Sequence, residues 1–166
     1  GICGGLQMLG ATVRDPEGVE GPPCDGVAGL GLLALDTCFG PDKRLARTDA
    51  TWLPTADDGP AASSPWSALA GTAVAGYEIR HGRTQPTGMP PAGATPHAVL
   101  HDADGQALGW QQGAVLGVYL HGLFEDPQAL RALFGGAVRP LDTVMDGLAD
   151  FIDTHMNPGA LNSLLG

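Results

Sequence analysis

The chain begins with a cysteine set among glycines, in the sequence GICGG at residues 1–5. A nucleophile flanked by glycines is typical of an elbow, a sharp turn from a strand into a helix where the backbone comes too close for side chains. The apolar spacing that follows predicts the helix over residues 4–9. A thiol at a helix N-terminus lies at the positive end of the helix dipole, which favours the reactive thiolate. The pattern predicts Cys3 as a nucleophile, although a small buried cysteine in a glycine-rich turn fits these five residues equally well.

His121 is the candidate base for this nucleophile. It follows the apolar run VLGVYL at residues 115–120, and the end of a buried strand is the usual place for a catalytic group in an α/β sheet. Without Cys3, a lone histidine of this kind would more often be structural. The remaining histidines show no metal-ligand spacing, so no metal site is predicted. Three of them are expected to be structural or solvated: His97, His101 and His155.

Apolar runs and turn residues predict a series of short strands followed by two helices. The stretch 27–37 is expected to be a loop that leads into a buried strand, and residues 43–52 are expected to be its partner strand. Further strands are expected at residues 73–80, 98–101, 107–111 and 115–120. One helix is expected to begin at Pro127, and an amphipathic one is expected over residues 141–155. The face of the second helix that is expected to be buried consists of Leu141, Val144, Leu148, Phe151 and Ile152. The breaker-rich segments 54–65 and 86–96 are expected to be surface loops.

Length and charge limit the class of protein. A chain of 166 residues with 43% hydrophobic content is long enough for one domain with a sizeable core. A net charge of −10 offers no basic stripe for nucleic acid or for an anionic membrane. No apolar run is long enough to span a bilayer and no signal peptide is recognisable, so the protein is expected to be cytoplasmic. Three cysteines without a C-x-x-C pair suit reduced thiols better than disulfides.

Four motifs, in the same order, carry a family resemblance. They are GICGGLQMLG at 1–10, GLGLLALDTCF at 29–39, GYEIRHGRT at 76–84 and LGVYLHGLF at 116–124. Together they resemble the class I glutamine amidotransferase domain of the cobyric acid synthase family. The third motif resembles that family rather than the related cobyrinate diamide synthases. The glutaminase subunit that amidates the peptidoglycan precursor lipid II shares the elbow and a GRT-like segment, so it is the alternative.

The resemblance implies a class I glutamine amidotransferase-like fold, an α/β domain with a central, mostly parallel sheet flanked by helices. Because the chain opens at the elbow without an initiator methionine, residues 1–166 are expected to be an N-terminally incomplete glutaminase domain without its first strands. The resemblance also implies an ATP-dependent synthetase domain in cis, which would use ATP and Mg²⁺. That domain is expected outside this chain, which contains no G-x-x-x-x-G-K-[ST] phosphate loop. No cofactor is expected in the glutaminase domain.

Individual roles are also implied by the resemblance. Cys3 would attack the side-chain carboxamide of glutamine, and His121 would protonate the leaving ammonia and activate the water that hydrolyses the thioester. The backbone N–H of Gly4 would donate to the oxyanion, Gln7 would touch the bound glutamine, and Arg44 would pair with the substrate carboxylate. For the last two, a solvated helix residue and an exposed arginine are the alternatives.

Several positions depart from the family pattern. Leu123 stands where many class I glutaminases have the glutamate of a catalytic triad, so a Cys-His dyad is implied. Glu125 is a nearby candidate to orient His121, with a solvated residue that caps the next turn as the alternative. Arg80 stands where the family usually has histidine, and His81 follows one position later, on the opposite face of a strand.

The predicted function is release of ammonia from glutamine for the amidation of peripheral carboxylates on a corrinoid in cobalamin biosynthesis. In this reaction cobyrinic acid a,c-diamide would become cobyric acid. The expected partners are glutamine, the synthetase domain and, at the synthetase site, the corrinoid. A non-catalytic docking fragment is a further hypothesis, prompted by the start of the chain and by the irregularity at Arg80 and His81; the presence of Cys3 and His121 argues against it.

Overall fold

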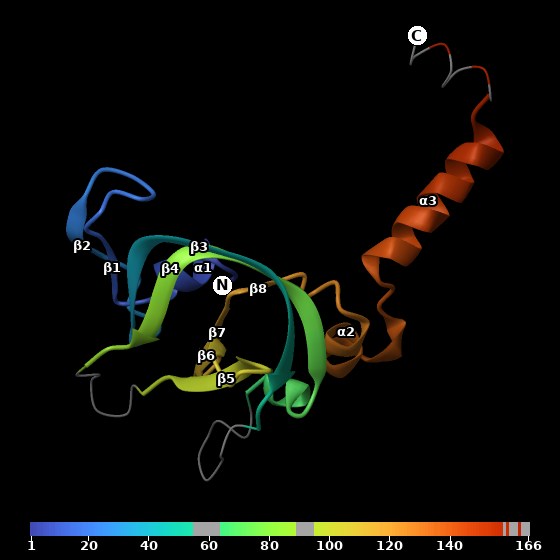
Figure 1. Cartoon of the computed structure of the whole chain (residues 1–166). Helices are drawn as coiled ribbons and strands as arrows, with labels where there is room; N and C mark the ends of the chain where they lie inside the picture. Colours follow the sequence, from blue (N-terminus) through green and yellow to red (C-terminus); the bar gives the residue numbers. More distant parts are fainter. Residues whose placement is uncertain (55–63, 89–94, 158, 160–162, 164–166) are drawn as a thin grey trace.

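The computed structural model describes residues 1–54, 64–88, 95–157, 159 and 163. Most of the two expected loops, at 54–65 and 86–96, lies outside these residues. The elements in chain order are α1 (Gly4–Leu9), β1 (Thr12–Asp15), β2 (Cys24–Ala28), β3 (Leu35–Trp52), the 3-10 turn η2 (Ser67–Leu69), β4 (Ala73–Pro86), β5 (His97–Asp102), β6 (Ala107–Gln112), β7 (Val115–Val118), β8 (Leu120–His121), α2 (Pro127–Phe134), the 3-10 turn η3 (Gly135–Ala137) and α3 (Leu141–His155). Figure 1 shows a curved sheet with α1 against it and α2 and α3 beside it. The expected helices and the strands at 73–80, 98–101 and 107–111 are confirmed, and β4 is longer than expected. The strand expected at the end of 27–37 and its expected partner at 43–52 are instead one unbroken strand, β3. The strand expected at 115–120 is divided at Tyr119 into β7 and β8.

The sheet is mixed, and antiparallel pairings dominate its described part. Its strand order is β2-β1-β3-β5-β6-β7, and β4 pairs with both β3 and β8. Within the described strands only β1 and β3 run parallel. The α/β class is confirmed, but the expectation of a mostly parallel sheet is wrong for these strands. Tight turns with positive φ at Gly105 and Gly113 join β5, β6 and β7 and reverse the chain, whereas a parallel neighbour needs a longer crossover.

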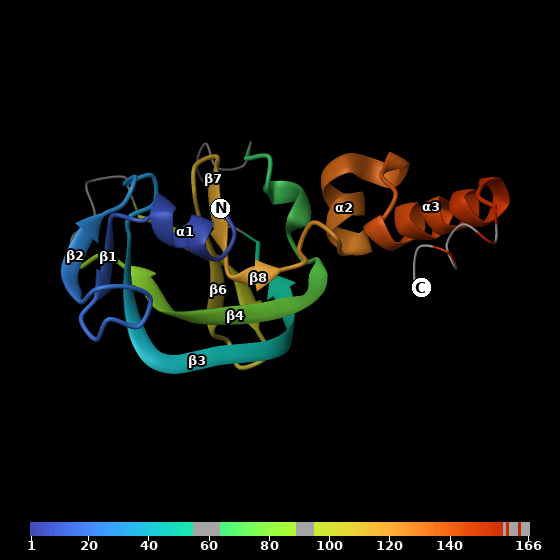
Figure 2. The same cartoon turned by 90° about the horizontal axis from the view of Figure 1, so that it is seen from above.

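Strands β3 and β4 form the longest pairing, which runs from Leu35 opposite Pro86 to Thr51 opposite Ala73. In Figures 1 and 2 the two strands make a curved ribbon that passes beside β6 and β7. The other edge of β4 pairs with β8, where Tyr77 lies opposite His121. Strand β4 is therefore held on both edges, by β3 on one side and by β8 on the other.

Helix α1 is held on the sheet by a compact apolar cluster. The cluster consists of Leu6, Leu33, Leu35, Trp110 and Tyr119. Gly117 on β7 has no side chain to keep the helix at a distance: an ideal Cβ there would lie 2.3 Å from Cδ1 of Leu6. This close approach places α1, and the turn that precedes it, at the end of β7.

Helix α2 begins at Pro127, as expected, and Asp126 caps its N-terminus. The Asp126 carboxylate accepts hydrogen bonds from the N–H groups of Gln128 at 2.8 Å and Ala129 at 3.0 Å. Its second oxygen accepts one from Ala75 at 3.2 Å, which ties the helix to β4.

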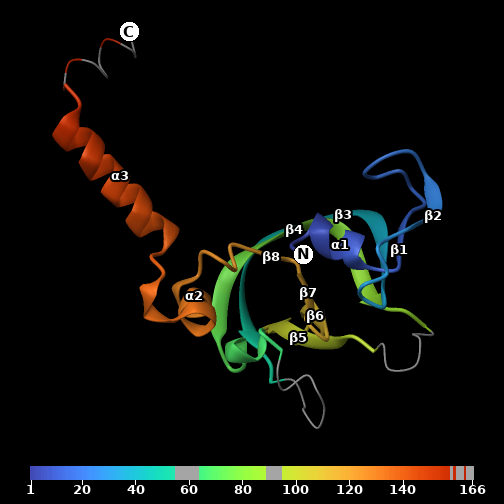
Figure 3. The same cartoon turned by 180° about the vertical axis from the view of Figure 1, so that it is seen from behind.

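Helix α3 spans Leu141–His155 as expected, but its apolar face is not buried. Leu148 and Phe151 are 52% and 58% exposed, and Figures 1 and 3 show the helix extending away from the sheet. The amphipathic spacing predicted the helix because helicity is encoded locally. Burial also needs a facing surface, and the described residues do not supply one.

No helix in the described part of the chain is long and apolar enough to cross a membrane.

Asp15, at the end of β1, is a buried carboxylate that organises the following turn. It accepts hydrogen bonds from the backbone N–H groups of Val19 at 2.8 Å, Glu20 at 2.9 Å and Gly21 at 3.2 Å. Burial acts to raise the pKa of this carboxyl, but the N–H donors outweigh burial and hold the pKa below its ordinary value of 3.8.

Replacing Asp15 with asparagine is expected to lower the free energy of unfolding at neutral pH and to have little effect in acid. A carboxyl whose pKa is lowered by folding stabilises the folded state above its unfolded pKa, and this contribution is lost as the pH falls through the folded pKa. Urea unfolding of the parent and Asp15→Asn, measured from neutral pH down to about pH 2, should give free energies that converge below about pH 4. A difference that stays constant over this range would contradict the assignment.

Candidate active site

Cys3 occupies a strained turn directly before α1. Its backbone has φ 51° and ψ −112°, and it is the only residue other than glycine with positive φ in the described part of the chain. Such a conformation costs of order 1–3 kcal/mol in a residue with a side chain. Three backbone hydrogen bonds surround it: Cys3 N–H donates to Val118 at 2.8 Å, Gln7 N–H to Cys3 at 3.2 Å, and Gly5 N–H to Ile2 at 2.8 Å. The turn has the form expected of a nucleophile elbow.

The glycines of the elbow are needed to different degrees. An ideal Cβ on Gly1 would lie 2.5 Å from the carbonyl carbon of Gly5, so no side chain fits there. Nothing lies within 4 Å of a Cβ built on Gly4 or Gly5. The steric reason for glycine, expected on both sides of the nucleophile, therefore holds only on the N-terminal side.

Cys3 and His121 both lie against the same short segment of β4. The Cys3 thiol donates to the carbonyl oxygen of Ile79 at 3.3 Å. His121 pairs with Tyr77, two residues earlier on the same strand. The Nε2 atom of His121 is buried and has no hydrogen-bond partner among the described residues. A buried ring nitrogen without a hydrogen-bond partner is available to exchange a proton with a group that comes within reach.

Gly4, the predicted oxyanion donor, is the first residue of α1. Its N–H makes no backbone hydrogen bond to the described residues. The first N–H groups of a helix have no partner within the helix and are free to bind a negative oxygen.

Gln7 is buried, so the alternative of a solvated helix residue is wrong. Its Nε2 donates to the hydroxyl of Tyr119 at 3.3 Å. An ideal Cβ on Gly82 would lie 2.5 Å from this Nε2, which shows how closely the amide packs on β4. Contact of Gln7 with glutamine stays a prediction.

Arg44 reaches from β3 across to the inner face of β4. Its Nε lies 3.2 Å from Oε1 of Glu78, and its side chain is 48% exposed. Among the described residues, no side chain or carbonyl forms an ion pair or hydrogen bond with its two Nη groups. Glu78 is fully buried and immediately precedes Ile79, the residue that accepts the Cys3 thiol. Arg44, which is predicted to bind the substrate carboxylate, is therefore anchored to Glu78. Glu78 is the residue next to Ile79, which the thiol of Cys3 contacts.

Arg80 shares the same carboxylate. Its Nη2 lies 3.0 Å from Oε1 of Glu78, and its Nη1 donates to the carbonyl oxygen of Gly82 at 2.6 Å. Its guanidinium carbon lies 4.5 Å from the centre of the Tyr119 ring, which is cation–π distance. His81, one position later, has Nδ1 at 3.3 Å from the carbonyl oxygen of Gly40. The arginine therefore occupies the inward position of β4, where the family usually has histidine.

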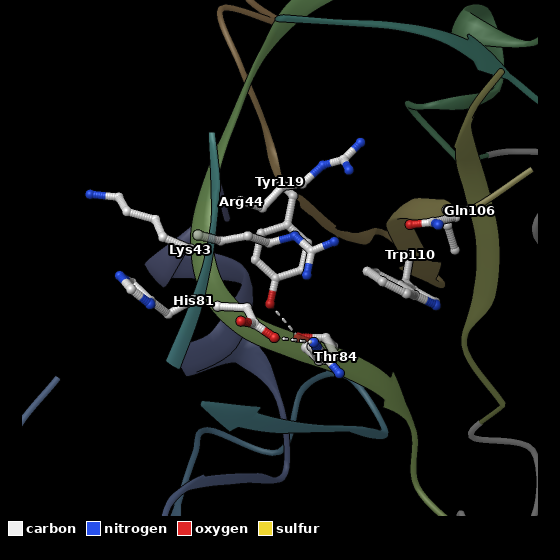
Figure 4. Close-up of a pocket in the computed structure, with 11 residues that line it drawn as sticks. Lys43, Arg44, His81, Thr84, Gln106, Trp110 and Tyr119 are labelled. Carbon is white, nitrogen blue, oxygen red and sulfur yellow. Dashed lines mark hydrogen bonds and ion pairs between the residues drawn. The ribbon is translucent and has the colours of Figure 1, made fainter. Parts of the chain in front are cut away.

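A cavity of about 570 Å³ opens beside these arginines. Its basic lining residues are Lys43, Arg44, Arg80, His81 and Arg83, and its aromatic ones are Trp110 and Tyr119. Figure 4 shows the hydroxyl of Tyr119 bonded to Thr84, and the ring of Trp110 lies edge-on to that of Tyr119, with their centroids 6.3 Å apart. Cys3 and His121 do not line this cavity. Their positions are defined instead by their contacts with Ile79 and Tyr77 on β4. The lining holds four Lys and Arg side chains against one carboxylate, that of Asp42, and this excess of positive charge suits a ligand with a carboxylate.

The position of the usual triad glutamate holds a core residue. Leu123 is fully buried in the larger apolar core. Glu125 is exposed, and within the described residues no hydrogen bond or ion pair joins its side chain to His121. The arrangement fits a Cys-His dyad, and Glu125 does not orient the histidine here.

Four residues near the site were not singled out from the sequence: Glu78, Thr84, Trp110 and Tyr119. Glu78 lies within the GYEIRHGRT motif, and the alternation of β4 gives one usable signal. Val74, Gly76 and Glu78 all face inward, so a carboxylate at this position had to be buried and therefore paired. Tyr119 gave no comparable signal, because it stands in an apolar run.

Comparisons with known proteins show the family to which the chain is similar. The family described as the CobB/CobQ-like glutamine amidotransferase domain matches residues 1–129. Cobyric acid synthase of Methylibium petroleiphilum is 55% identical over 166 residues, covering 99% of this chain and 31% of the relative. Cobyric acid synthases of Albidiferax ferrireducens and of a Polaromonas species are 52% and 47% identical; each match covers 99% of this chain, and 32% and 30% of the relative. The chain thus spans about a third of the length of these relatives, and the class I glutamine amidotransferase-like fold is confirmed.

Proposed function

The chain belongs to the CobB/CobQ-like glutamine amidotransferase domain family, and we propose that it releases ammonia from glutamine with Cys3 as nucleophile and His121 as acid–base group. The observation that carries this proposal is the strained backbone of Cys3, whose thiol contacts β4 two residues from the partner of His121. Strain of this kind persists where a side chain must stand exposed on a sharp turn to react.

In the proposed reaction, Sγ of Cys3 attacks the side-chain carbonyl carbon of glutamine while the thiol proton passes to His121. The oxyanion accepts a hydrogen bond from Gly4, an interaction typically worth about 3 kcal/mol. The C–N bond then breaks, and His121 returns its proton to the leaving ammonia. Water, deprotonated by His121, attacks the resulting thioester; the C–S bond breaks, glutamate leaves, and the proton restores the thiol of Cys3.

We place the α-carboxylate of glutamine on Arg44, whose Nη groups face no other partner in the described residues. A guanidinium binds a carboxylate through two parallel hydrogen bonds, which fixes orientation as well as position. Gln7 remains a predicted contact of glutamine through α1.

The ammonia is proposed to amidate side-chain carboxylates of a corrinoid, giving cobyric acid. This is supported by the relatives, which are cobyric acid synthases at 47–55% identity. In this proposal the carboxylates are activated with ATP and Mg²⁺ in the part of such proteins that this chain does not span. The same relatives favour the corrinoid over the peptidoglycan precursor as the final acceptor.

Incubation of the full-length protein with glutamine tests the glutaminase step. Glutamate and ammonia should appear in equal amounts, and Cys3→Ala should fall to the level of a blank without protein. Alkylation of the parent with iodoacetamide should have the same effect if Cys3 is the reacting thiol. Release by the parent that does not exceed release by Cys3→Ala would instead support a non-catalytic docking domain.

A further inference from the structure

Glu78 is a carboxylate that the reaction itself does not use, yet it lies between two arginines on the inner face of β4. Oε1 of Glu78 is 3.2 Å from Nε of Arg44 and 3.0 Å from Nη2 of Arg80, at ion-pair distance, and neither oxygen of Glu78 has an aligned hydrogen-bond partner among the described residues. Its side chain is 1% exposed. A carboxylate this deeply buried is costly unless it is paired with cations.

The two arginines need this carboxylate because they oppose each other in the sheet. Arg44 and Arg80 are directly paired in the register of β3 and β4. Like charges opposite one another on neighbouring strands repel, so without Glu78 the exposed Arg44 would turn away towards solvent.

The two arginines differ in how many of their guanidinium groups already have partners within the protein. Arg80 uses one Nη on Glu78, the other on Gly82, and one face of its guanidinium on Tyr119. Its side chain is only 14% exposed, so it has little left to offer a ligand. Arg44 uses only Nε on Glu78 and is 48% exposed, which leaves the fork of its two Nη groups open.

We propose that Glu78 is a positioning residue for substrate binding: it holds Arg44 by Nε so that the two Nη groups receive the α-carboxylate of glutamine, while Arg80 braces Glu78 from the other side. The proposal deepens the glutaminase function and rests on it. It gives a reason for the position of Glu78 next to Ile79. Arg44, which binds the substrate carboxylate, and Cys3, the nucleophile, then contact adjacent residues of one strand. Contacts through one strand keep the two ends of a small substrate at a fixed separation.

Glu78→Gln in the full-length protein tests the proposal by separating binding from chemistry. KM for glutamine should rise about tenfold or more, the usual loss for a displaced charge-assisted hydrogen bond, while kcat changes by less than about threefold. The matched control is Asp49→Asn, which removes an exposed carboxylate from the same strand, β3, outside the cavity. An exposed carboxylate away from the cavity should contribute little, and both constants should stay at the parent values.

A substrate without the carboxylate distinguishes positioning from a general structural role. In 4-aminobutanamide a hydrogen atom replaces the α-carboxylate of glutamine. The parent should use it with a raised KM, and Glu78→Gln should give no further increase, because Arg44 then has nothing to bind. An equal rise in KM for both substrates would overturn the proposal.

Glu78→Asp keeps the test decisive if Glu78→Gln does not fold, because it retains the buried charge between the arginines but withdraws it by one methylene from Nε of Arg44. KM for glutamine should then rise and KM for 4-aminobutanamide should not. Arg44→Gln tests the other partner of the pair. Removing the exposed arginine leaves Glu78 paired with Arg80, so this variant should fold and show the raised KM for glutamine. Adding Glu78→Gln to it should not raise KM further, because the two residues act as a unit. Additive effects on KM in the double variant, or an unchanged KM in Glu78→Gln with an active parent, would overturn this proposal and leave the glutaminase function standing. A parent no more active than Cys3→Ala would overturn both.

Discussion

Replacing Cys3 with glycine is expected to abolish glutamine hydrolysis and to give a more stable protein than replacing it with alanine. Both variants lack the thiol, so glutamate release should fall by at least about a thousandfold in each. They differ in the backbone, because alanine must still adopt φ 51° and ψ −112°. Glycine adopts this conformation without steric cost, which recovers about 1–3 kcal/mol.

Part of that gain is offset in the unfolded state. Glycine loses more conformational freedom on folding than alanine does, a penalty of about 0.5–1 kcal/mol. A net advantage of about 1 kcal/mol should remain, which corresponds to a rise in Tm of about 2–4 °C for a chain of this size. Thermal unfolding of the two variants measures the difference. Equal stability, or a less stable Cys3→Gly, would show that the turn carries no strain at the nucleophile.

Replacing Gly76 with alanine is expected to reduce turnover by displacing His121 without touching either reacting residue. An ideal Cβ on Gly76 would lie 2.2 Å from the carbonyl oxygen of His121 and 2.8 Å from Cγ of Leu120. The obstacle is backbone, so β8 must move away from β4. Overpacking of this kind costs about 1–3 kcal/mol of stability, and a shift of about 1 Å at a catalytic group lowers the rate by about a hundredfold.

Gly40→Ala is the matched control for this change. Gly40 also lies in the β3–β4 ribbon, but nothing lies within 4 Å of a Cβ built there. Its kcat should equal that of the parent, whereas Gly76→Ala should lose kcat with a smaller effect on KM. A Gly76→Ala variant with parental turnover would mean that the position of His121 relative to β4 does not matter for the reaction.

The elbow and its histidine could be predicted from the sequence because both depend on local patterns. A glycine-flanked cysteine before apolar residues at helical spacing determines a turn and a helix within ten residues, and α1 ends at Leu9 as predicted. His121 was recognisable because an apolar strand leads into it. The strands β4, β5 and β6 were recognisable for the same reason, since alternation and turn glycines are read along the chain. The continuity of β3 was missed because Gly40-Pro41-Asp42 has the composition of a turn.

Features that depend on strand register could not be predicted in this way. The meeting of Arg44, Glu78 and Arg80 follows from the pairing of β3 with β4 and from the irregularity between Phe39 and Arg44. No spacing within one segment encodes which residues lie opposite one another across a bulge. The direction of the strands was mispredicted because the family resemblance, rather than the hairpin turns of this chain, was used to infer it.

Helix α3 has a consequence for how the protein melts. The sheet, α1 and α2 share apolar cores and should unfold as one cooperative unit, but none of the residues of α3 is buried. A helix of 15 residues without tertiary support is marginal in water, so α3 should fray gradually as the temperature rises. Circular dichroism of the helical signal and tryptophan fluorescence would then follow different events in the same molecule, because Trp52, Trp66 and Trp110 all belong to the sheet domain and none lies on α3. Only the second reports the cooperative transition of the part of the fold that carries Cys3 and His121.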